Sequence, residues 1–201
     1  MRRCNAFAFL SALALWLLAA AVQAQQELPA NGLFLIAKPS LVDPNFSQTV
    51  VLVTQTEDAS TVGVIINRPT ILKLSQFLTG EFPTGNYREP IFFGGPVMRQ
   101  VLVSLFRSET MPAAAAFHVL KDVYLTMHPD NIELLLKDAG ARYRIYAGFS
   151  GWAPRQLESE FMRDSWYILP ADEATVFREK SEGLWEDLVE RALRLGPRVS
   201  R

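Results

Sequence analysis

The sequence feature that most limits how this chain can fold is the stretch at residues 142–160. Polar and apolar side chains alternate over residues 142–146, which predicts a β-strand. Two glycines within residues 148–151 then predict a turn, and Leu157 and Phe161 are spaced to share one face of a helix. A strand, a glycine turn and a helix start in succession bring backbone N–H groups together, as in many α/β sites. The stretch therefore predicts a domain built from both sheet and helix.

The rest of the chain alternates short apolar runs with turn signals. Predicted strands cover residues 32–37, 48–55, 62–67, 91–93, 101–106, 119–127 (one strand or a pair of short ones), 143–146 and 166–169. Predicted helices cover residues 72–78, 131–139 (capped by Asp130), 154–163, 172–177 (capped by Asp172) and 184–195. Hairpins come first and helix–strand alternation follows, which predicts a single α+β domain with a mixed sheet covered by helices.

The first 24 residues have the pattern of a secretory signal peptide. Two arginines precede an apolar run over residues 6–21, and residues 22–24 offer small side chains where a signal peptidase reads. We expect cleavage after Ala24, leaving a domain at residues 25–201 that is periplasmic or secreted. The alternative is an uncleaved anchor helix, but the apolar run is shorter than the roughly 20 residues that span a bilayer.

Composition excludes several kinds of function for the domain after the signal segment. The only cysteine of the chain, Cys4, lies in the signal segment. The domain therefore has no disulfide, thiolate nucleophile or cysteine metal site. Without the two arginines of the segment, the 20 Lys and Arg fall to 18 against 21 Asp and Glu, a net charge near −3. This acidic balance argues against nucleic acid as a partner, and against membrane contact except through an uncleaved signal segment.

Ser150 lies in a sequence that approaches the nucleophile elbow of serine hydrolases. The elbow requires Gly-x-Ser-x-Gly, and Trp152 occupies the place of the second glycine. Both histidines, His118 and His128, precede Ser150, whereas α/β-hydrolases place their histidine last. We interpret Ser150 as a cap of the turn or helix, Trp152 as a core residue and Gly151 as a turn residue at positive φ. A hydrolase or transferase that uses Ser150 is the alternative.

Other motifs give no catalytic residue, cofactor site or metal site. The two histidines have no metal-ligand spacing, and Gly94-Gly95-Pro96 lacks the Gly-Lys-Ser/Thr of a phosphate-binding loop. Asn67-Arg68-Pro69 ends a predicted strand, where an amide and a guanidinium can bind an anion. A turn capped by the asparagine side chain explains the same motif equally well.

Six motifs in a fixed order resemble those of the bacterial AlgH/YqgE family. They are Pro39-Ser40-Leu41-x-Asp43-Pro44-x-Phe46, Gly63-x-x-x-Asn67-x-Pro69, Gly94-Gly95-Pro96-Val97, Gly148-x-Ser150-Gly151-Trp152-x-x-x-Gln156-Leu157-Glu158-x-Glu160, Ser165-Trp166 and Pro170-Ala171-Asp172. The resemblance runs from residue 32 to about residue 190. It implies that family's α+β fold, a barrel-like sheet flanked by helices. It brings no established catalytic residues, and the family name implies a regulator.

Two features depart from that family's pattern. Members usually carry a histidine where this chain has Phe106, and they are typically cytosolic, whereas this chain has a signal peptide. We therefore expect a periplasmic protein that binds an unknown protein or small ligand, with a cytoplasmic transcriptional regulator as the alternative if the signal segment is unused. The expected site is a groove between the end of the strand at residues 63–67 and the turn at residues 150–151. Its expected polar and aromatic residues are Asn67, Arg68, Ser150, Trp152, Gln156 and Glu160.

Overall fold

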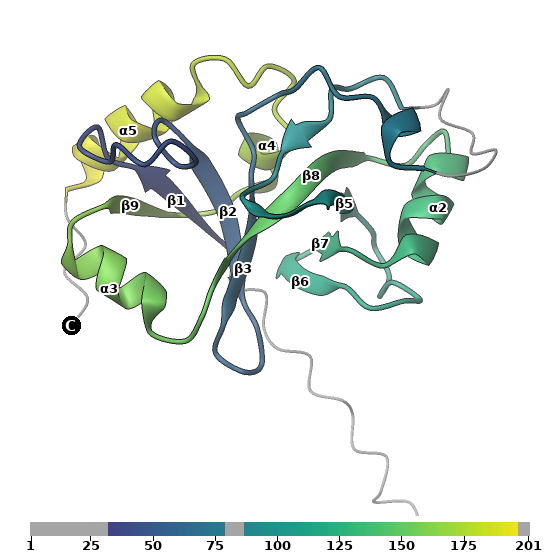
Figure 1. Ribbon diagram of the computed structural model, residues 1–201, viewed down its shortest axis with the longest axis horizontal. Helices are drawn as coiled ribbons and strands as arrows, with labels where there is room; N and C mark the ends of the chain where they lie inside the picture. The colour runs from purple at the N-terminus through teal and green to yellow at the C-terminus, as the bar shows by residue number, and fades with distance from the viewer. Residues whose placement is uncertain (1–31, 79–86, 197–201) are drawn as a thin grey trace, which may run out of the picture.

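The computed structural model describes residues 32–78 and 87–196 (Figure 1). The predicted signal peptide and its cleavage site therefore lie outside the described residues. Among the helices of these two ranges, none combines the length and the apolar character that crossing a bilayer requires.

One sheet organises the described chain. Its strands are β1 (Leu33–Ala37), β2 (Val50–Gln55), β3 (Thr61–Ile65), β4 (Phe92–Phe93), β5 (Val97–Arg107), β6 (Phe117–Leu120), β7 (Val123–Thr126), β8 (Tyr143–Trp152) and β9 (Trp166–Pro170). The order is β6-β7-β5-β8-β3-β2-β1-β9, and the neighbours in it are antiparallel. The short β4 runs parallel to β8. The prediction of a mixed sheet with helices is confirmed.

The barrel-like closure expected of this sheet is not found among the described strands. The strand order has two ends, β6 and β9, with no ladder between them. The sheet still curves, because the N–H of Gly32, just before β1, donates to the carbonyl of Val119 in β6 at 2.8 Å. Oγ1 of Thr54 in β2 also donates to the carbonyl of His118 in β6, at 3.2 Å. Isolated bonds of this kind join the two halves without making a continuous ladder.

Helices cover the sheet at separate places, as Figure 1 shows. They are the 3-10 turn η1 (Leu74–Gln76) and the helices α2 (Pro129–Lys137), α3 (Gln156–Met162), α4 (Glu173–Val176) and α5 (Leu184–Leu195). Successive residues of β1 point to opposite faces, so Phe34 packs in the cluster that includes α5, whereas Leu35 packs in the cluster that includes α3. A third cluster lies beneath α2. The sheet therefore has apolar side chains on both faces.

β8 is longer than the sequence predicts and crosses the middle of the molecule (Figure 1). It continues through the glycines to Trp152, so the predicted turn at residues 148–151 is wrong. Gly148 has a φ of 71°, opposite an irregularity in the β5 ladder between Val97 and Leu102. A glycine in this conformation can form a bulge within a strand as well as a turn between elements. Gly151 is not among the glycines with positive φ, and it pairs with Val62 of β3. The prediction that Gly151 is a turn residue at positive φ is therefore also wrong.

Candidate functional site

The loop at residues 43–48 is folded by its own first residue. Oδ1 of Asp43 accepts hydrogen bonds from the N–H groups of Asn45 and Phe46, at 2.8 and 3.2 Å. The carbonyl of Asp43 also accepts from the N–H of Ser47, at 2.7 Å. An aspartate before a proline commonly closes a turn in this way, and the Asp43-Pro44 pair is the sequence signal for it.

Arg68 holds this loop from the side. Its Nη1 donates to the carbonyls of Pro44 and Asn45 at 3.3 and 2.8 Å, and its Nη2 donates to the carbonyl of Ser47 at 3.0 Å. Burial lowers the pKa of the Arg68 guanidinium, and the carboxylate of Asp43 opposes that shift. An arginine stays charged under such a shift, so Arg68 fixes the loop at three carbonyl groups by charged hydrogen bonds.

Asn67 holds the end of the same loop. Its Oδ1 accepts from the N–H of Val50 at 2.9 Å, and its Nδ2 donates to the carbonyl of Gln48 at 3.0 Å. Gln48 has a φ of 56°, a conformation that few residues other than glycine adopt. The motif Asn67-Arg68-Pro69 has two interpretations, an anion site or a turn capped by the asparagine side chain. The amide of Asn67 fits the capped turn, because both of its polar atoms bond the backbone.

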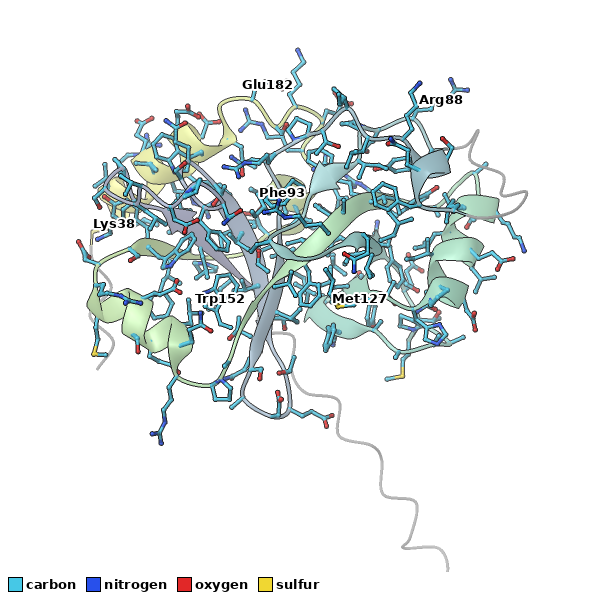
Figure 2. All side chains as sticks on the ribbon, in the orientation of Figure 1. Lys38, Arg88, Phe93, Met127, Trp152 and Glu182 are labelled. Carbon is cyan, nitrogen blue, oxygen red and sulfur yellow. The ribbon has the colours of Figure 1, made fainter. Side chains whose placement is uncertain are left out.

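Arg99 of β5 reaches the loop from a third direction. Its Nη2 donates to Oδ1 of Asn45 at 3.0 Å. The guanidinium carbons of Arg99 and Arg68 lie 5.2 and 5.7 Å from the ring centroid of Phe93, which Figure 2 labels. Within the described ranges, neither arginine forms an ion pair with a carboxylate. Two cations therefore converge on one aromatic ring, a favourable arrangement for each of them singly.

Phe46 connects the loop to the aromatic residues near α3. Its ring lies 5.8 Å from Trp152 and 5.6 Å from Trp166, centroid to centroid. Oε1 of Glu160 accepts from Nε1 of Trp152 at 3.2 Å, and Oε2 accepts from Nε1 of Trp166 at 2.8 Å. Trp152 is only 3% exposed, which confirms its expected place in the core (Figure 2). Glu160 thus accepts hydrogen bonds from two indole N–H groups. Burying these groups without an acceptor would lower the stability of the domain.

Ser150 lies inside β8 and is fully buried, at 0% exposure. Its hydroxyl donates to the carbonyl of Gly94 at 3.1 Å, and that carbonyl also accepts from the N–H of Ile65 at 3.0 Å. Ser150 therefore bonds β8 to the turn after β4, and its predicted role as a cap of the turn or helix is wrong. A nucleophile needs an adjacent base, and the hydroxyl here is directed at a backbone carbonyl.

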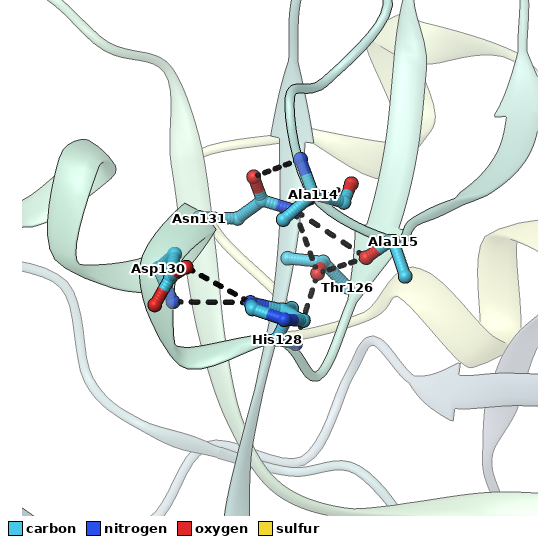
Figure 3. A network of polar contacts seen from close by, with 6 residues as sticks. All are labelled: Ala114, Ala115, Thr126, His128, Asp130 and Asn131. Carbon is cyan, nitrogen blue, oxygen red and sulfur yellow. Dashed lines mark hydrogen bonds and ion pairs between the residues drawn. The ribbon is translucent and has the colours of Figure 1, made fainter.

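The two histidines lie in other environments. Nε2 of His118 is 3.0 Å from the carbonyl of Lys121, and His128 is the N-cap of α2. Nδ1 of His128 accepts from the N–H of Asp130 at 3.3 Å (Figure 3), so the cap is the histidine and not Asp130 as predicted. Proline at the first helical position starts the helix at residue 129, two residues earlier than predicted. In the described part of the chain, no cluster of three or more His, Cys, Asp or Glu side chains has the arrangement of a metal site.

The six residues of the predicted groove thus fall into two contacting sets and two separate residues. Asn67 and Arg68 both hold the loop at residues 43–48, and Trp152 contacts Glu160. Phe46 joins these sets, whereas the hydroxyl of Ser150 donates to the carbonyl of Gly94, outside both sets. Gln156 is exposed at the start of α3, where its Oε1 accepts from the N–H of Ala153 at 3.2 Å. Whether the region holds a ligand stays a prediction.

Sequence reasoning missed three residues of this region, Asn45, Phe93 and Arg99. Asn45 and Phe93 lie beside quoted motifs, but no local pattern indicates what they contact. Arg99 follows Gly94-Gly95-Pro96-Val97 by two residues and looks like an ordinary strand residue. The sheet brings all three together.

Comparison with known proteins decides the family. A sequence model described as AlgH-like matches residues 34–194, nearly all of the described chain. The chain belongs to the AlgH-like family. A UPF0301 protein of Streptomyces avermitilis is 32% identical over 80% of this chain and 86% of its own length. Another, from Methylococcus capsulatus, is 35% identical over 82% of this chain and 89% of its own length.

Two solved structures have a similar fold. The solution structure of the AlgH protein from Pseudomonas aeruginosa matches with a TM-score of 0.67 and 29% identity, over 83% of this chain and 89% of that one. A crystal structure of a Corynebacterium diphtheriae protein matches with a TM-score of 0.62 over 86% of this chain and 90% of that one. At 23% identity the second likeness shows the fold alone. The resemblance inferred from the ordered motifs is thus confirmed for the family.

Proposed function

We propose that this protein acts by binding a partner through the surface around residues 43–48, without a catalytic centre. One observation carries the proposal, namely that side chains from separate segments fix the loop. Asn67 and Arg68 follow β3, Arg99 comes from β5, and Phe46 is inserted against Trp152 and Trp166. A loop held on a rigid sheet loses little conformational freedom when a partner docks, which favours binding.

In this proposal, some residues of the predicted groove contact the partner and others support the binding surface from beneath. Gln156 is exposed, and Asn67, Arg68 and Glu160 are half-buried, so a partner reaches at least part of each. The buried Ser150 and Trp152 support the surface from beneath by fixing β8 to its neighbours. The partner is a protein or a small ligand, and the net negative charge disfavours nucleic acid.

We propose further that the protein works in the periplasm after removal of residues 1–24. The basic start, the apolar run and the small residues before Gln25 support this. Mass spectrometry of the protein from the native host should find a mature N-terminus at Gln25 in the periplasmic fraction. A full-length chain in the cytoplasm would instead favour the regulator that the family name implied.

The binding surface is tested by pull-down with the mature protein from a periplasmic extract of the native host. Val42 is 87% exposed next to the loop, so Val42→Asp should abolish specific capture while the melting temperature stays unchanged. The matched control is Met162→Asp, at an 82% exposed apolar side chain of α3. An Asn67/Arg68 double alanine variant should lose the same partner.

Capture that is equal for wild type, Val42→Asp and the double variant would contradict the proposal. The double variant is also expected to loosen the loop, so its loss alone would not distinguish binding from folding. Val42→Asp makes that distinction because the side chain that it replaces is 87% exposed.

A further inference from the structure

We propose that Arg99, together with Arg68 and the ring of Phe93, binds the carboxylate of a ligand that carries an apolar group beside it. The inference rests on the proposed function, because it uses the same surface, and it names the chemical class of the ligand. Its basis is the geometry of the two guanidiniums around one ring.

Arg99 is an exposed cation with most of its hydrogen-bonding capacity unused. Within the described residues its only hydrogen bond is from Nη2 to Oδ1 of Asn45, at 3.0 Å. A guanidinium has further N–H donors on its remaining edges, and these can meet both oxygens of a carboxylate at once. The bond to Asn45 and the contact with Phe93 fix the plane of the guanidinium beforehand.

The charge around Arg99 also favours an anion. Six arginines of the described ranges have carboxylate partners, namely Arg107, Arg142, Arg144, Arg178, Arg191 and Arg194, whereas the exposed Arg88, Arg155 and Arg163 have none there. Arg99 and Arg68 have none at ion-pair distance in the described ranges, although Asp43 lies close enough to affect the pKa of Arg68. Two like charges beside one ring repel each other, and a bound carboxylate would relieve that repulsion.

The backbone near Arg99 adopts conformations that ordinary residues avoid. Met98, directly before Arg99, has a φ of 47°, and Gln48, at the end of the loop, has a φ of 56°. A Cβ on Gly148 would lie 3.0 Å from Cα of Arg99, so the bare glycine leaves room for this path of β5. Unfavourable conformations held by surrounding structure are concentrated at binding sites, where they direct particular side chains.

Phe93 indicates the second property of the ligand. It is half-buried, and its ring is contacted by two guanidiniums rather than enclosed by the core alone. The remaining ring surface suits an apolar group next to the carboxylate. A small organic acid and the C-terminal carboxylate of a peptide with an apolar last residue both have this chemistry.

Titration calorimetry of the mature protein with three probes tests the inference. N-acetylphenylalanine provides the carboxylate beside an apolar ring, N-acetylphenylalaninamide has the same shape without the charge, and inorganic phosphate is an anion without the apolar group. We expect the acid to bind at least tenfold more tightly than the amide or phosphate. An acetylated tripeptide ending in phenylalanine distinguishes the sources: tighter binding than N-acetylphenylalanine indicates a peptide, and equal binding a small acid.

Variants assign the binding to Arg99. Arg99→Gln should weaken binding of the acid at least tenfold with only a small drop in the melting temperature, because the bond to Asn45 that it removes is exposed. Arg99→Lys should keep only part of the affinity because lysine lacks the planar guanidinium. The control is Arg163→Gln, at an exposed arginine at the end of α3, which should bind as wild type does.

Four results would overturn the inference. They are equal affinity for acid and amide, unchanged binding by Arg99→Gln, binding of phosphate but not of the acid, and absence of binding by every probe. A pull-down that still depends on Val42 would then leave the proposed function standing, so the two failures are distinguishable.

Discussion

Trp152 and Trp166 lie edge to face, with ring centroids 6.3 Å apart and an interplanar angle of 84°, and both donate to the carboxylate of Glu160. Trp152 ends β8 and Trp166 begins β9, so this one side chain of α3 connects two strands that are not neighbours in the sheet. Phe46 completes the group from the loop side.

Removing the carboxylate of Glu160 should destabilise the domain. Glu160→Ala leaves two buried indole N–H groups without an acceptor, which we expect to cost about 2–4 kcal/mol in the free energy of unfolding. Glu160→Gln keeps one acceptor oxygen and should cost about half as much. Urea unfolding followed by tryptophan fluorescence measures both, with the exposed Glu158→Ala as the control. If Glu160→Ala lowered the free energy of unfolding no more than Glu158→Ala does, the stabilising role of the Glu160 carboxylate would be contradicted.

The two glycines of β8 should respond differently to alanine. Gly148→Ala introduces a side chain at a φ of 71° with its Cβ 2.7 Å from the carbonyl oxygen of Val97, and should cost about 2 kcal/mol or more. In Gly151→Ala the closest contact of the new Cβ is with the ring of Phe149, at 3.3 Å. Because that ring can shift, we expect the free energy of unfolding to fall by less than about 1 kcal/mol. Thermal unfolding compares the two. Equal losses would show that Gly148 does not form the bulge described.

Asn131 should hold the loop before β6 in place (Figure 3). Its Nδ2 donates to Oγ1 of Thr126 at 3.1 Å and to the carbonyl of Ala114 at 3.1 Å, and its Oδ1 accepts from the N–H of Ala114 at 3.3 Å. Asn131→Ala should cost about 1–3 kcal/mol and release the loop. Limited proteolysis should then cut within residues 111–116 faster than in wild type. The control Glu133→Gln, at a half-buried residue of the same helix, should be cut at the wild-type rate.

Asp172 should make part of the stability dependent on pH. Burial alone raises the pKa of its carboxyl, but hydrogen bonds from Thr175 and the pair with Arg191 outweigh burial and leave the pKa below its usual 3.8. A group with a lowered folded pKa adds stability above its unfolded pKa, and this is lost as pH falls through the folded pKa. Asp172→Asn keeps the N-cap but cannot titrate.

We therefore expect wild type to be more stable than Asp172→Asn at neutral pH, and the difference to shrink below about pH 4. Urea unfolding of both proteins between pH 3 and 7 measures this difference in stability. A difference that stays constant over that range would mean that Asp172 contributes only as a neutral cap.

Ser150 should be structural and unreactive. Ser150→Ala removes the hydrogen bond to the carbonyl of Gly94 and should cost about 1 kcal/mol, since Ile65 still donates to that carbonyl. A fluorophosphonate probe should leave the wild-type protein unlabelled. Labelling that disappears in Ser150→Ala would instead support the hydrolase alternative.

Much of the fold was determined by local sequence patterns. Alternation and β-branched residues predicted the β2–β3 hairpin, and Asp172 was predicted as the cap of the helix observed at Glu173–Val176. The ordered motifs predicted the family. These predictions succeeded because periodicity and capping depend on residues within a few positions of one another.

Only the tertiary structure decided how distant segments use their polar groups. The sequence could not show that Arg68 bonds carbonyls more than twenty residues earlier, that Arg99 meets Asn45, or that the strand order leaves two ends. Nor could it distinguish a turn from a bulge at Gly148, because both use a glycine at positive φ and only the facing β5 strand selects between them. Pairing across the sheet is set by long-range packing, for which the local pattern carries no signal.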